Sequence, residues 1–460
     1  MLRFRRRRRS ERLQTRMREI REENVANNPA CCFFFFFDKR EIFWDNGGMI
    51  EAEETNRMQH KEHYDRVRTR RLGGIAFLFG FSDSFLVYIL SAYFSEAIGN
   101  ANVSMFYFLA FGVMLALLFF LHALVRLIGG HLLFLLLLFG VVVIQVPLIF
   151  LPTSLWGSVF IMLYLIVTTL AWVTFDMVLE NVSEDRRSGR IRGMNLSAMN
   201  MGFLFAPFLS AVILGHFGFS GVFFVSLVFY SALFLVALLL LVGSKRPVEH
   251  RISPIEILRK VLRRADILRI YTVSFALNFF YATMIVYTSL RLRELGMSWG
   301  NIGIVFTVML IPFVVIQYPL GSLADRRLGE KELLIGSLLL AALSTASLVW
   351  IQSASVLIWA VMLFVTRIGI AGVEVLGDSY FYKRIEGSDS DLIAFFRTAR
   401  PVGNIIAALF LGLWLLFFSL SSVFVLPAIV LLFAVIPAFL LEDNPSEYEQ
   451  GRILQRESGI

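Results

Sequence analysis

The chain has 460 residues, of which 57% are hydrophobic and only 17% are charged, whereas soluble domains average about 25% charged residues. Its mean hydropathy is +0.70, so it has too little polar surface to be wetted on every side. The formal net charge of +8 is concentrated in an N-terminal tail and in short breaks between apolar runs, as membrane topology requires. We therefore expect an integral membrane protein, and not a soluble enzyme, a nucleic-acid binder or a disordered regulator.

Residues 1–71 form a basic tail before the first apolar run. Its RFRRRRR cluster could hold anionic lipid. The two cysteines of the chain, Cys31 and Cys32, are adjacent and lie in this tail, so they form neither a disulfide framework nor a CxxC metal site. The alternative is that translation begins at Met49 or Met58, and we assign no function to the tail.

From residue 72 onward, apolar stretches of about 20 residues alternate with short polar breaks. A helix rises 1.5 Å per residue, so about 20 residues cross the ~30 Å hydrocarbon core. The strict alternation of membrane-barrel strands is missing from these runs. We predict an all-α membrane protein with twelve transmembrane helices. They cover residues 72–96, 103–125, 131–151, 155–180, 193–215, 219–243, 268–291, 300–322, 332–351, 354–378, 392–415 and 420–442.

Lys and Arg residues are distributed unevenly over the breaks between these spans. With the N-terminus in the cytoplasm, the outer breaks hold only Arg291 and Arg293, and the other basic residues fall on inner breaks. Basic loops stay on the cytoplasmic side, so both termini are predicted to be cytoplasmic. The short loops favour a multi-pass protein of a prokaryotic plasma membrane. The inner basic residues are Arg126, Arg186, Arg187, Arg190, Arg192, a group from Lys245 to Arg269, Arg326, Arg327, Lys331, Lys383 and Arg384.

A long charged break at 244–267 divides the spans into a first half, 72–243, and a second half, 268–442. Its PIEILRKVLRRADILR segment has amphipathic helical spacing and is expected to lie along the inner membrane surface. A second cytoplasmic tail, 443–460, follows the last span.

The two halves resemble each other at a shift of about 198 residues. Span four ends in the acidic pair Asp176 and Glu180, and span ten ends in the pair Glu374 and Asp378. Parallel halves of six helices are a transporter architecture with the pathway between them.

The segment GSLADRRLGEKELL, residues 321–334, follows span eight. It resembles the inner-loop signature GxLADRxGR[RK] of the major facilitator superfamily of secondary transporters. Gly321 permits close helix approach, Asp325 can accept hydrogen bonds at a helix N-terminus, Arg326 holds the loop inside, and Gly329 suits a tight turn. We expect a structural or gating role for these residues.

The resemblance to the superfamily covers residues 72–442 and implies two pseudo-symmetric six-helix bundles. This copy of the signature departs by an extra residue at Leu328 and by Glu330 in a basic position. In the first half, Arg126 stands where the aspartate is expected, and it could pair with Asp176 or Glu180.

Span five contains MGFLFAPFLSA. Gly202, Ala206 and Pro207 are similar to the superfamily's antiporter signature GxxxGPxxGG, which is associated with export. Small residues let helices approach and proline bends a span. The alternative is ordinary helix packing.

Two ionisable residues stand near the middle of predicted spans, where a charged side chain costs about 2.5–3.5 kcal/mol on insertion scales. Asp83 in span one is suited to taking up and releasing a proton, and the alternative is a packing residue bonded by its neighbours. Arg367 in span ten cannot lose its charge. Its anion could be Asp83, Glu374 or an acidic substrate.

Asn278, Tyr281 and Tyr88 could line a cavity between the halves, with helix packing as the alternative. Nearer the inside, Arg397 and Arg400 lie three residues apart on span eleven. Their depth matches that of Glu374 and Asp378, so we expect an ion-pair cluster that acts as an inner gate.

The histidines share no face at metal-ligand spacing, and a Walker loop, GxSxG or HExxH motif is missing from the sequence. We expect no metal, no cofactor and no enzyme activity.

The sequence therefore predicts a monomeric, proton-coupled secondary transporter of a small organic molecule, working by alternating access in the lipid bilayer without a nucleic-acid partner. Export is favoured over uptake on the span-five motif. One alternative is a proton-coupled sugar or nutrient importer. The other is a non-transporting membrane sensor or scaffold.

Overall fold

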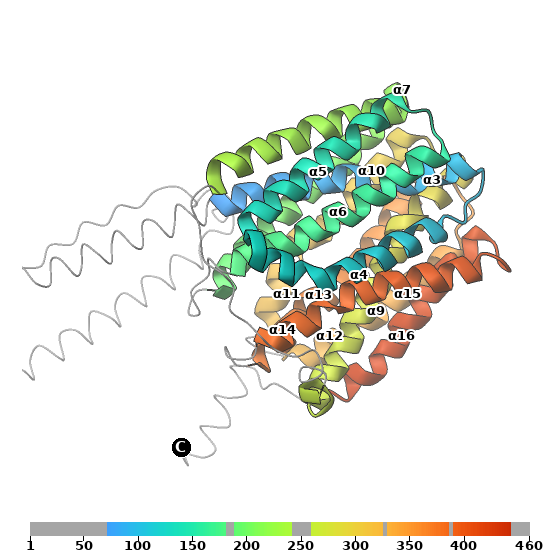
Figure 1. Cartoon of the computed structure of the whole chain (residues 1–460). Coiled ribbons are helices and arrows are strands. Elements are labelled where there is room, and N and C mark those ends of the chain that lie inside the picture. The colour runs from blue at the N-terminus through green and yellow to red at the C-terminus, as the bar shows by residue number, and fades with distance from the viewer. Residues whose placement is uncertain (1–70, 181–187, 242–258, 325–328, 386–389, 443–460) are drawn as a thin grey trace, which may run out of the picture. The chain divides into compact units, whose positions relative to one another are not determined.

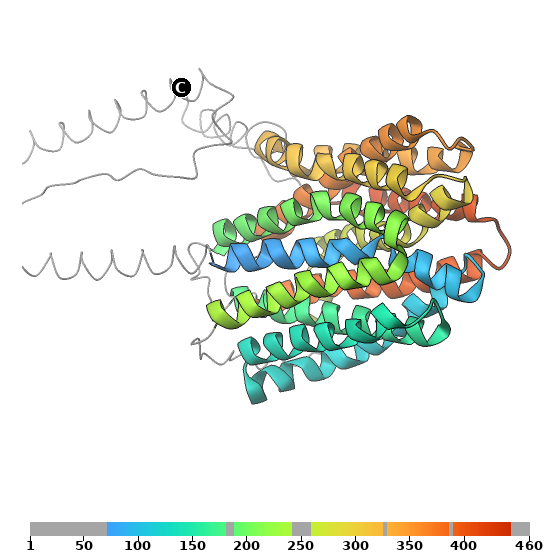
Figure 2. The same ribbon diagram turned by 90° about the horizontal axis from the view of Figure 1, so that it is seen from above.

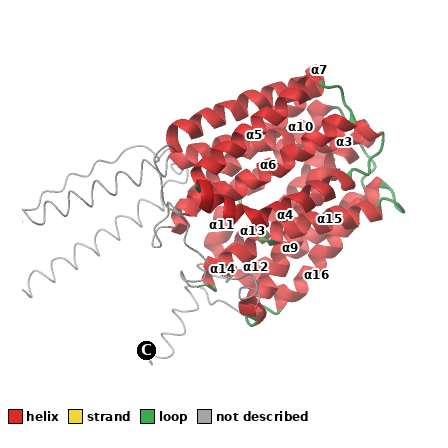
Figure 3. Ribbon diagram, viewed as in Figure 1, coloured by secondary structure: helices red, strands yellow, loops and turns green. Residues whose placement is uncertain are grey.

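The computed structural model describes residues 71–180, 188–241, 259–324, 329–385 and 390–442. All of them lie in one compact unit, residues 66–460. The described residues form helices joined by turns and short loops, without a strand (Figure 3), which confirms the all-α class. The predictions for the tails fall on residues outside this part of the chain. Of the predicted linker helix, residues 259–269 are described: residues 259–262 are helical, and residues 265–269 form the start of the long helix Ala265–Glu294.

The first predicted span is the apolar helical segment Arg71–Ile98. Its helix is interrupted by a turn at Tyr88 and Ile89, and the part that follows is α3, Leu90–Ile98. The other helices of the first half are α4 (Ser104–Ile128), α5 (Gly130–Phe150), α6 (Leu155–Glu180) and α7 (Ser188–Leu241).

The long element α7 covers predicted spans five and six, between which the chain turns back (Figure 1). The break is Gly218, with φ of 66° and ψ of −168°. Glycine adopts positive φ without a Cβ clash, so a single residue replaces the loop that the sequence predicted there.

The second half contains α9 to α16, and two of its predicted spans are divided where prolines stand. Span eight is interrupted at Ile316 and span eleven at Thr398. Pro319 and Pro401 lack the N–H that would bond the carbonyl four residues earlier, which places the breaks after Val315 and Arg397. The helices are α9 (Ala265–Glu294), α10 (Trp299–Val315), α11 (Gln317–Leu323), α12 (Glu330–Ser347), α13 (Val356–Lys383), α14 (Ser390–Arg397), α15 (Ala399–Trp414) and α16 (Val425–Phe439), with 3-10 turns η3 (Leu348–Trp350) and η4 (Leu420–Phe424).

The helices run side by side in a bundle (Figures 1 and 2). We call the end at which α7 finishes and α9 begins the linker end. There, Arg264 before α9 donates to the backbone carbonyl of Arg384 after α13, and Arg384 Nη1 lies 2.9 Å from Glu442 Oε2 after α16. We call the opposite end, where α4 begins and α15 finishes, the far end.

Many large apolar side chains on the outside of the bundle are exposed, as hydrocarbon contact requires. Within the described residues, nine helices are long and apolar enough to cross a membrane. One of them, Ala198–Leu241, covers two predicted spans, and α4 adds the shorter apolar stretch Ser104–Leu118. The described helices thus fall on the twelve predicted stretches, but spans eight and eleven are divided, and the two pieces of span eleven are each too short to be counted among the nine.

Among the described elements, the most extensive contacts between the halves are those of α3 with α9, α4 with α15, and α7 with α10. At the α7–α10 crossing, a Cβ on Gly303 would lie 2.9 Å from the Cβ of Ala211 and 3.2 Å from the Cα of Phe208. The missing side chain therefore lets the two backbones approach. The division into bundles 72–243 and 268–442 stays a prediction, because the described residues belong to one unit.

Replacing Gly303 with alanine should strain this crossing. We expect Gly303→Ala to lower the free energy of unfolding by about 1–3 kcal/mol, the usual cost of overpacking, measured by thermal unfolding in detergent. The matched control is Gly300→Ala on the same helix, where a Cβ would meet nothing within 4 Å. Alanine there should leave stability unchanged or raise it, and equal effects of the two changes would contradict the close contact.

Candidate functional site

Asp83 lies half-buried in the first span and is held by neutral hydrogen-bond donors. Its Oδ2 accepts from Trp172 Nε1 at 3.0 Å, and its Oδ1 accepts from the Tyr164 hydroxyl at 3.5 Å. The Tyr164 hydroxyl lies 2.9 Å from that of Tyr230. Within the described part of the chain, Asp83 forms no ion pair. These donors come from α6 and α7, so the first half alone builds the site.

The indole of Trp172 is fixed in place by its own packing. It stacks on Phe79 with ring centroids 3.8 Å apart and planes 6° from parallel. The N–H is therefore aimed at Asp83 before any ligand binds. Sequence reasoning missed the three donors, because an aromatic residue in an apolar run carries no sign of the helix it faces.

Glu374 is the counterpart of Asp83 in the second half. Its Oε2 accepts from Gln317 Nε2 at 2.9 Å and from the Tyr281 hydroxyl at 3.2 Å. Glu374 also lines a small pocket with Ser274 and Asp378. Tyr281, predicted as a cavity residue, thus contacts Glu374 directly. Gln317 was not predicted.

Arg400, exposed on α15, lies within electrostatic range of both carboxylates, Asp83 and Glu374. It belongs to the second half, so its attraction to Asp83 acts between the halves. Arg400 thus lies near one carboxylate of each half, and the inner gate stays a prediction.

Arg367 is 1% exposed and is surrounded by aromatic rings. Its guanidinium carbon lies 5.2 Å from the ring centre of Phe280, 5.7 Å from that of Tyr281 and 6.0 Å from that of Phe313. Its Nη2 faces the sulfur of Met309 at 3.9 Å. Among the described residues it has no ion pair, so neither carboxylate expected from the sequence lies within ion-pair distance.

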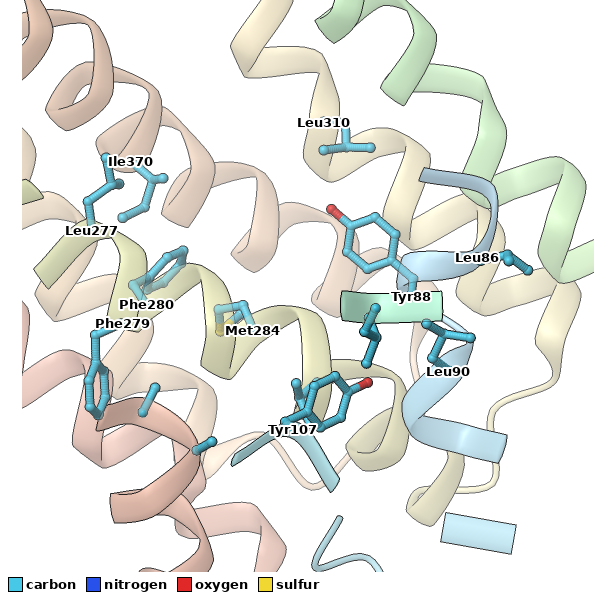
Figure 4. Close-up of a cluster of buried hydrophobic side chains, with 14 of the residues drawn as sticks. Leu86, Tyr88, Leu90, Tyr107, Leu277, Phe279, Phe280, Met284, Leu310 and Ile370 are labelled. Carbon is cyan, nitrogen blue, oxygen red and sulfur yellow. The ribbon is translucent and has the colours of Figure 1, made fainter. Parts of the chain in front are cut away.

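Tyr88 comes from the first half and is 5% exposed. Its ring lies 5.0 Å from that of Phe306 on α10. Figure 4 shows Tyr88 and Phe280 in one cluster of buried side chains, with the Tyr88 ring directed toward Leu310. Tyr88 therefore lies where the halves meet.

Asn278 takes part in helix packing. Its Nδ2 donates to the carbonyl of Ser274 at 2.7 Å. A Cβ on Gly403 of α15 would lie 2.9 Å from the Asn278 Cβ. The structure thus puts Asn278 at the α9–α15 crossing.

At the linker end, an ion pair joins the halves. Arg397 Nη1 lies 3.3 Å from Asp176 Oδ2, and both side chains are partly exposed. Arg126 is exposed and forms no ion pair with a described residue. The side chain of Glu180 lies outside the described residues.

The predicted inner loop is described only at its ends. Asp325 and Arg326 lie outside the described residues, and Gly329 has a φ of 73°, which suits the expected turn. A Cβ on Gly321 would lie 3.6 Å from a methyl of Val375 on α13. Gly321, on α11, therefore packs against α13.

Glu330, which departs from the signature, is buried and bonds to residues of α13. It is 0% exposed, pairs with Lys383 and accepts from Ser379 Oγ at 3.1 Å. The departure therefore serves to tie the start of α12 to the end of α13.

At the far end the halves are joined by hydrogen bonds, two of them between buried side chains. Ser91 and Ser289 lie 3.0 Å apart through their hydroxyls, and Ser104 bonds the hydroxyl of Tyr287. Asn102 Nδ2 donates to the carbonyl of Gly412 at 3.1 Å. The two ends thus differ: the far end is tied by buried hydroxyls, and the linker end by a partly exposed ion pair.

The span-five motif packs against the first span. A Cβ on Gly202 would lie 2.5 Å from the carbonyl oxygen of Phe77 and 2.7 Å from the nitrogen of Phe81. Ala206 is buried, and Pro207 lies inside α7. The motif therefore brings α7 against the first span close to Asp83.

The described residues thus form a bundle of apolar helices with charged groups buried inside it. Residues 72–377 and 292–456 match the family described as the Major Facilitator Superfamily. The chain belongs to this superfamily. A comparison with curated proteins finds no match.

Among solved structures, the chain is similar to a bacterial homologue of the human lysosomal transporter Spinster, in an inward-facing and unoccupied conformation. The TM-score is 0.61 at 11% identity, over 82% of this chain and 97% of that chain. At this identity the similarity shows the fold alone.

The contact between Trp172 and Asp83 predicts a spectroscopic signal. Loss of the Asp83 charge changes the field at the indole, so tryptophan fluorescence should change with pH. We expect this change to disappear in both Asp83→Asn and Trp172→Phe, although six other tryptophans remain of the seven. Persistence of the full change in either variant would show that Asp83 and Trp172 are not coupled.

The ion pair at the linker end predicts a charge-swap result. Asp176→Arg and Arg397→Asp should each lower stability by about 0.2–1 kcal/mol, because exposed pairs contribute little. The double swap should recover most of this loss in thermal unfolding. Arg126→Asp should change nothing, because this exposed arginine of the same end forms no ion pair with a described residue. Additive losses in the double variant would argue against the pair.

Proposed function

We propose that this protein is a proton-coupled transporter of a small organic molecule and that Asp83 binds the coupling proton. Membership of the superfamily supports secondary transport by alternating access. The observation that carries the finer proposal is a carboxylate at membrane depth that is held only by neutral donors. Such a carboxylate can gain or lose a proton without breaking an ion pair of its own.

Protonation of Asp83 would act on the contact between the halves. In the ionised state, Asp83 attracts Arg400 of the second half. Neutral Asp83 no longer attracts it, which weakens the association of the halves beside the Asp176–Arg397 pair. One bound proton thus favours separation at the linker end while the far end stays tied.

Glu374 would respond to the same events from the second half. Arg400 is attracted by both Glu374 and Asp83. When Asp83 is protonated and loses its negative charge, only the attraction by Glu374 remains of these two. The arginine can therefore move toward Glu374 when the proton binds. This exchange links protonation to a displacement of α15.

We infer export as the direction, because Gly202, Ala206 and Pro207 resemble the antiporter signature and pack beside the Asp83 region. We further propose a monomer in a prokaryotic plasma membrane with both termini in the cytoplasm, on the distribution of basic residues. The inward-facing state named for the Spinster homologue supports the proposed cycle, since alternating access requires such a state. An importer of sugars or other nutrients is the second candidate, and sugar-dependent proton uptake would favour it.

Asp83→Asn should abolish coupling while the protein stays folded. A thermal-shift panel of sugars, amino acids, organic anions and cationic drugs first identifies a ligand, since a ligand at 100 times its dissociation constant stabilises by about 2.7 kcal/mol. In proteoliposomes with an imposed pH gradient, wild type should then move that ligand against its own gradient. Asp83→Asn should move it only down its gradient.

The matched control is Glu96→Gln, an exposed acid of the same span, which should behave as wild type. Gradient-driven accumulation by Asp83→Asn would remove Asp83 from the mechanism but keep the transporter. If no compound of the panel stabilises the folded protein, the result would favour the non-transporting sensor or scaffold.

A further inference from the structure

A permanently charged side chain lies buried in the second half and forms no ion pair with any residue that the structure describes. Arg367 is 1% exposed and Arg keeps its charge at any physiological pH. Its Nε has no hydrogen-bond partner among the described residues, and its Nη2 faces only a thioether sulfur, a weak acceptor. A buried guanidinium with donors left unused is costly to the fold, and an anion bonded to it would lower that cost.

The nearby carboxylates do not fill this role. Glu374 stands two helical turns along α13, and its Oε2 accepts from Tyr281 and Gln317. Asp83 accepts from Trp172 and Tyr164. Glu374 lies within electrostatic range of Arg367 but forms no ion pair with it, and the hydrogen-bond donors to both acids among the described residues are neutral.

The rings around Arg367 define an apolar wall with one polar edge. Phe280 and Tyr281 on α9 and Phe313 on α10 face the guanidinium. The Tyr281 ring contacts Arg367 while its hydroxyl donates to Glu374. An anion that joined Arg367 would therefore lie against aromatic faces and near Glu374.

Access to Arg367 depends on the contact between the halves. The rings around it belong to the second half, whereas Tyr88 of the first half lies within electrostatic range of Arg367 and packs on Phe306. When the halves separate, Tyr88 withdraws with the first span. The arginine then faces the space between the halves.

We propose that Arg367 binds the anionic group of the transported molecule, a carboxylate or a phosphate, and that Phe280, Tyr281 and Phe313 pack on the apolar part next to it. The inference rests on the proposed transport function and names its substrate class, an organic anion. A guanidinium binds such groups through two parallel hydrogen bonds, which uses the donors that are free in this state.

Matched probes test the charge requirement. Benzoate and phenyl phosphate carry the anion, benzamide is the neutral counterpart of benzoate, and benzylammonium is a cation on the same ring. Thermal shift of purified protein should show stabilisation of wild type by the two anions and by neither of the others. Arg367→Gln should weaken anion binding by about tenfold or more, as loss of a charged hydrogen-bond partner does, and Arg367→Lys should retain part of it.

Two further variants separate binding from folding. Arg293→Gln is the control, because Arg293 also lies over an aromatic ring, 5.2 Å from that of Trp299, but at the far end. It should bind the anions as wild type does. Arg367→Met, an apolar side chain of similar length, should raise the unfolding temperature of the ligand-free protein, since it removes an unpaired buried charge, and should abolish the anion-induced shift.

The outcomes distinguish this inference from the transport proposal. If benzamide or benzylammonium binds, and this binding is lost in Asp83→Asn but kept in Arg367→Gln, the proposal of an anionic substrate is wrong and the transport proposal stands. Anion binding that is unchanged in Arg367→Gln, or a lower unfolding temperature of Arg367→Met with binding intact, makes the arginine structural and overturns the inference. Silence of all four probes with folded protein contradicts the inference and counts against transport as well.

Discussion

Hydrocarbon supplies no partner for an ionised group, so each charged side chain at membrane depth must find one inside the protein. The chain meets this constraint in three ways. Asp83 and Glu374 are held by neutral donors, each from its own half. Arg367 is held by aromatic faces and has no anion among the described residues. Arg400 stays exposed and acts on both acids. The partners of each charged side chain inside the bundle therefore reflect the free-energy cost of burying a charge.

The contacts between the halves complement this arrangement. At the far end, buried hydroxyls join them, as in the Ser91–Ser289 pair. At the linker end, the Asp176–Arg397 pair is partly exposed to solvent and is worth little. Asp83 and Glu374 lie between the far end and the linker end. A change in their charge therefore acts on an interface whose contacts are weaker at the linker end. In our account, this asymmetry converts protonation into movement.

Much of the fold was readable from the sequence, because runs of about 20 apolar residues can only be satisfied as spanning helices. Asp83 and Arg367 were readable for the same energetic reason. Their partners were not, since Trp172, Tyr164 and Gln317 carry no mark of the helix they face. Glu330 shows a second limit: it departs from a family pattern, yet its burial and its pair with Lys383 depend on how α12 meets α13.

The most direct test of the account measures distances between spin labels across both ends, with Cys31 and Cys32 replaced by serine. Exposed Leu127 and Leu323 report the linker end, and exposed Leu155 and Leu357 report the far end. Acidification should lengthen the linker-end distances and shorten or preserve those at the far end, and Asp83→Asn should remove the response. If the distance at each end stays the same at every pH, the result would contradict alternating access driven by protonation.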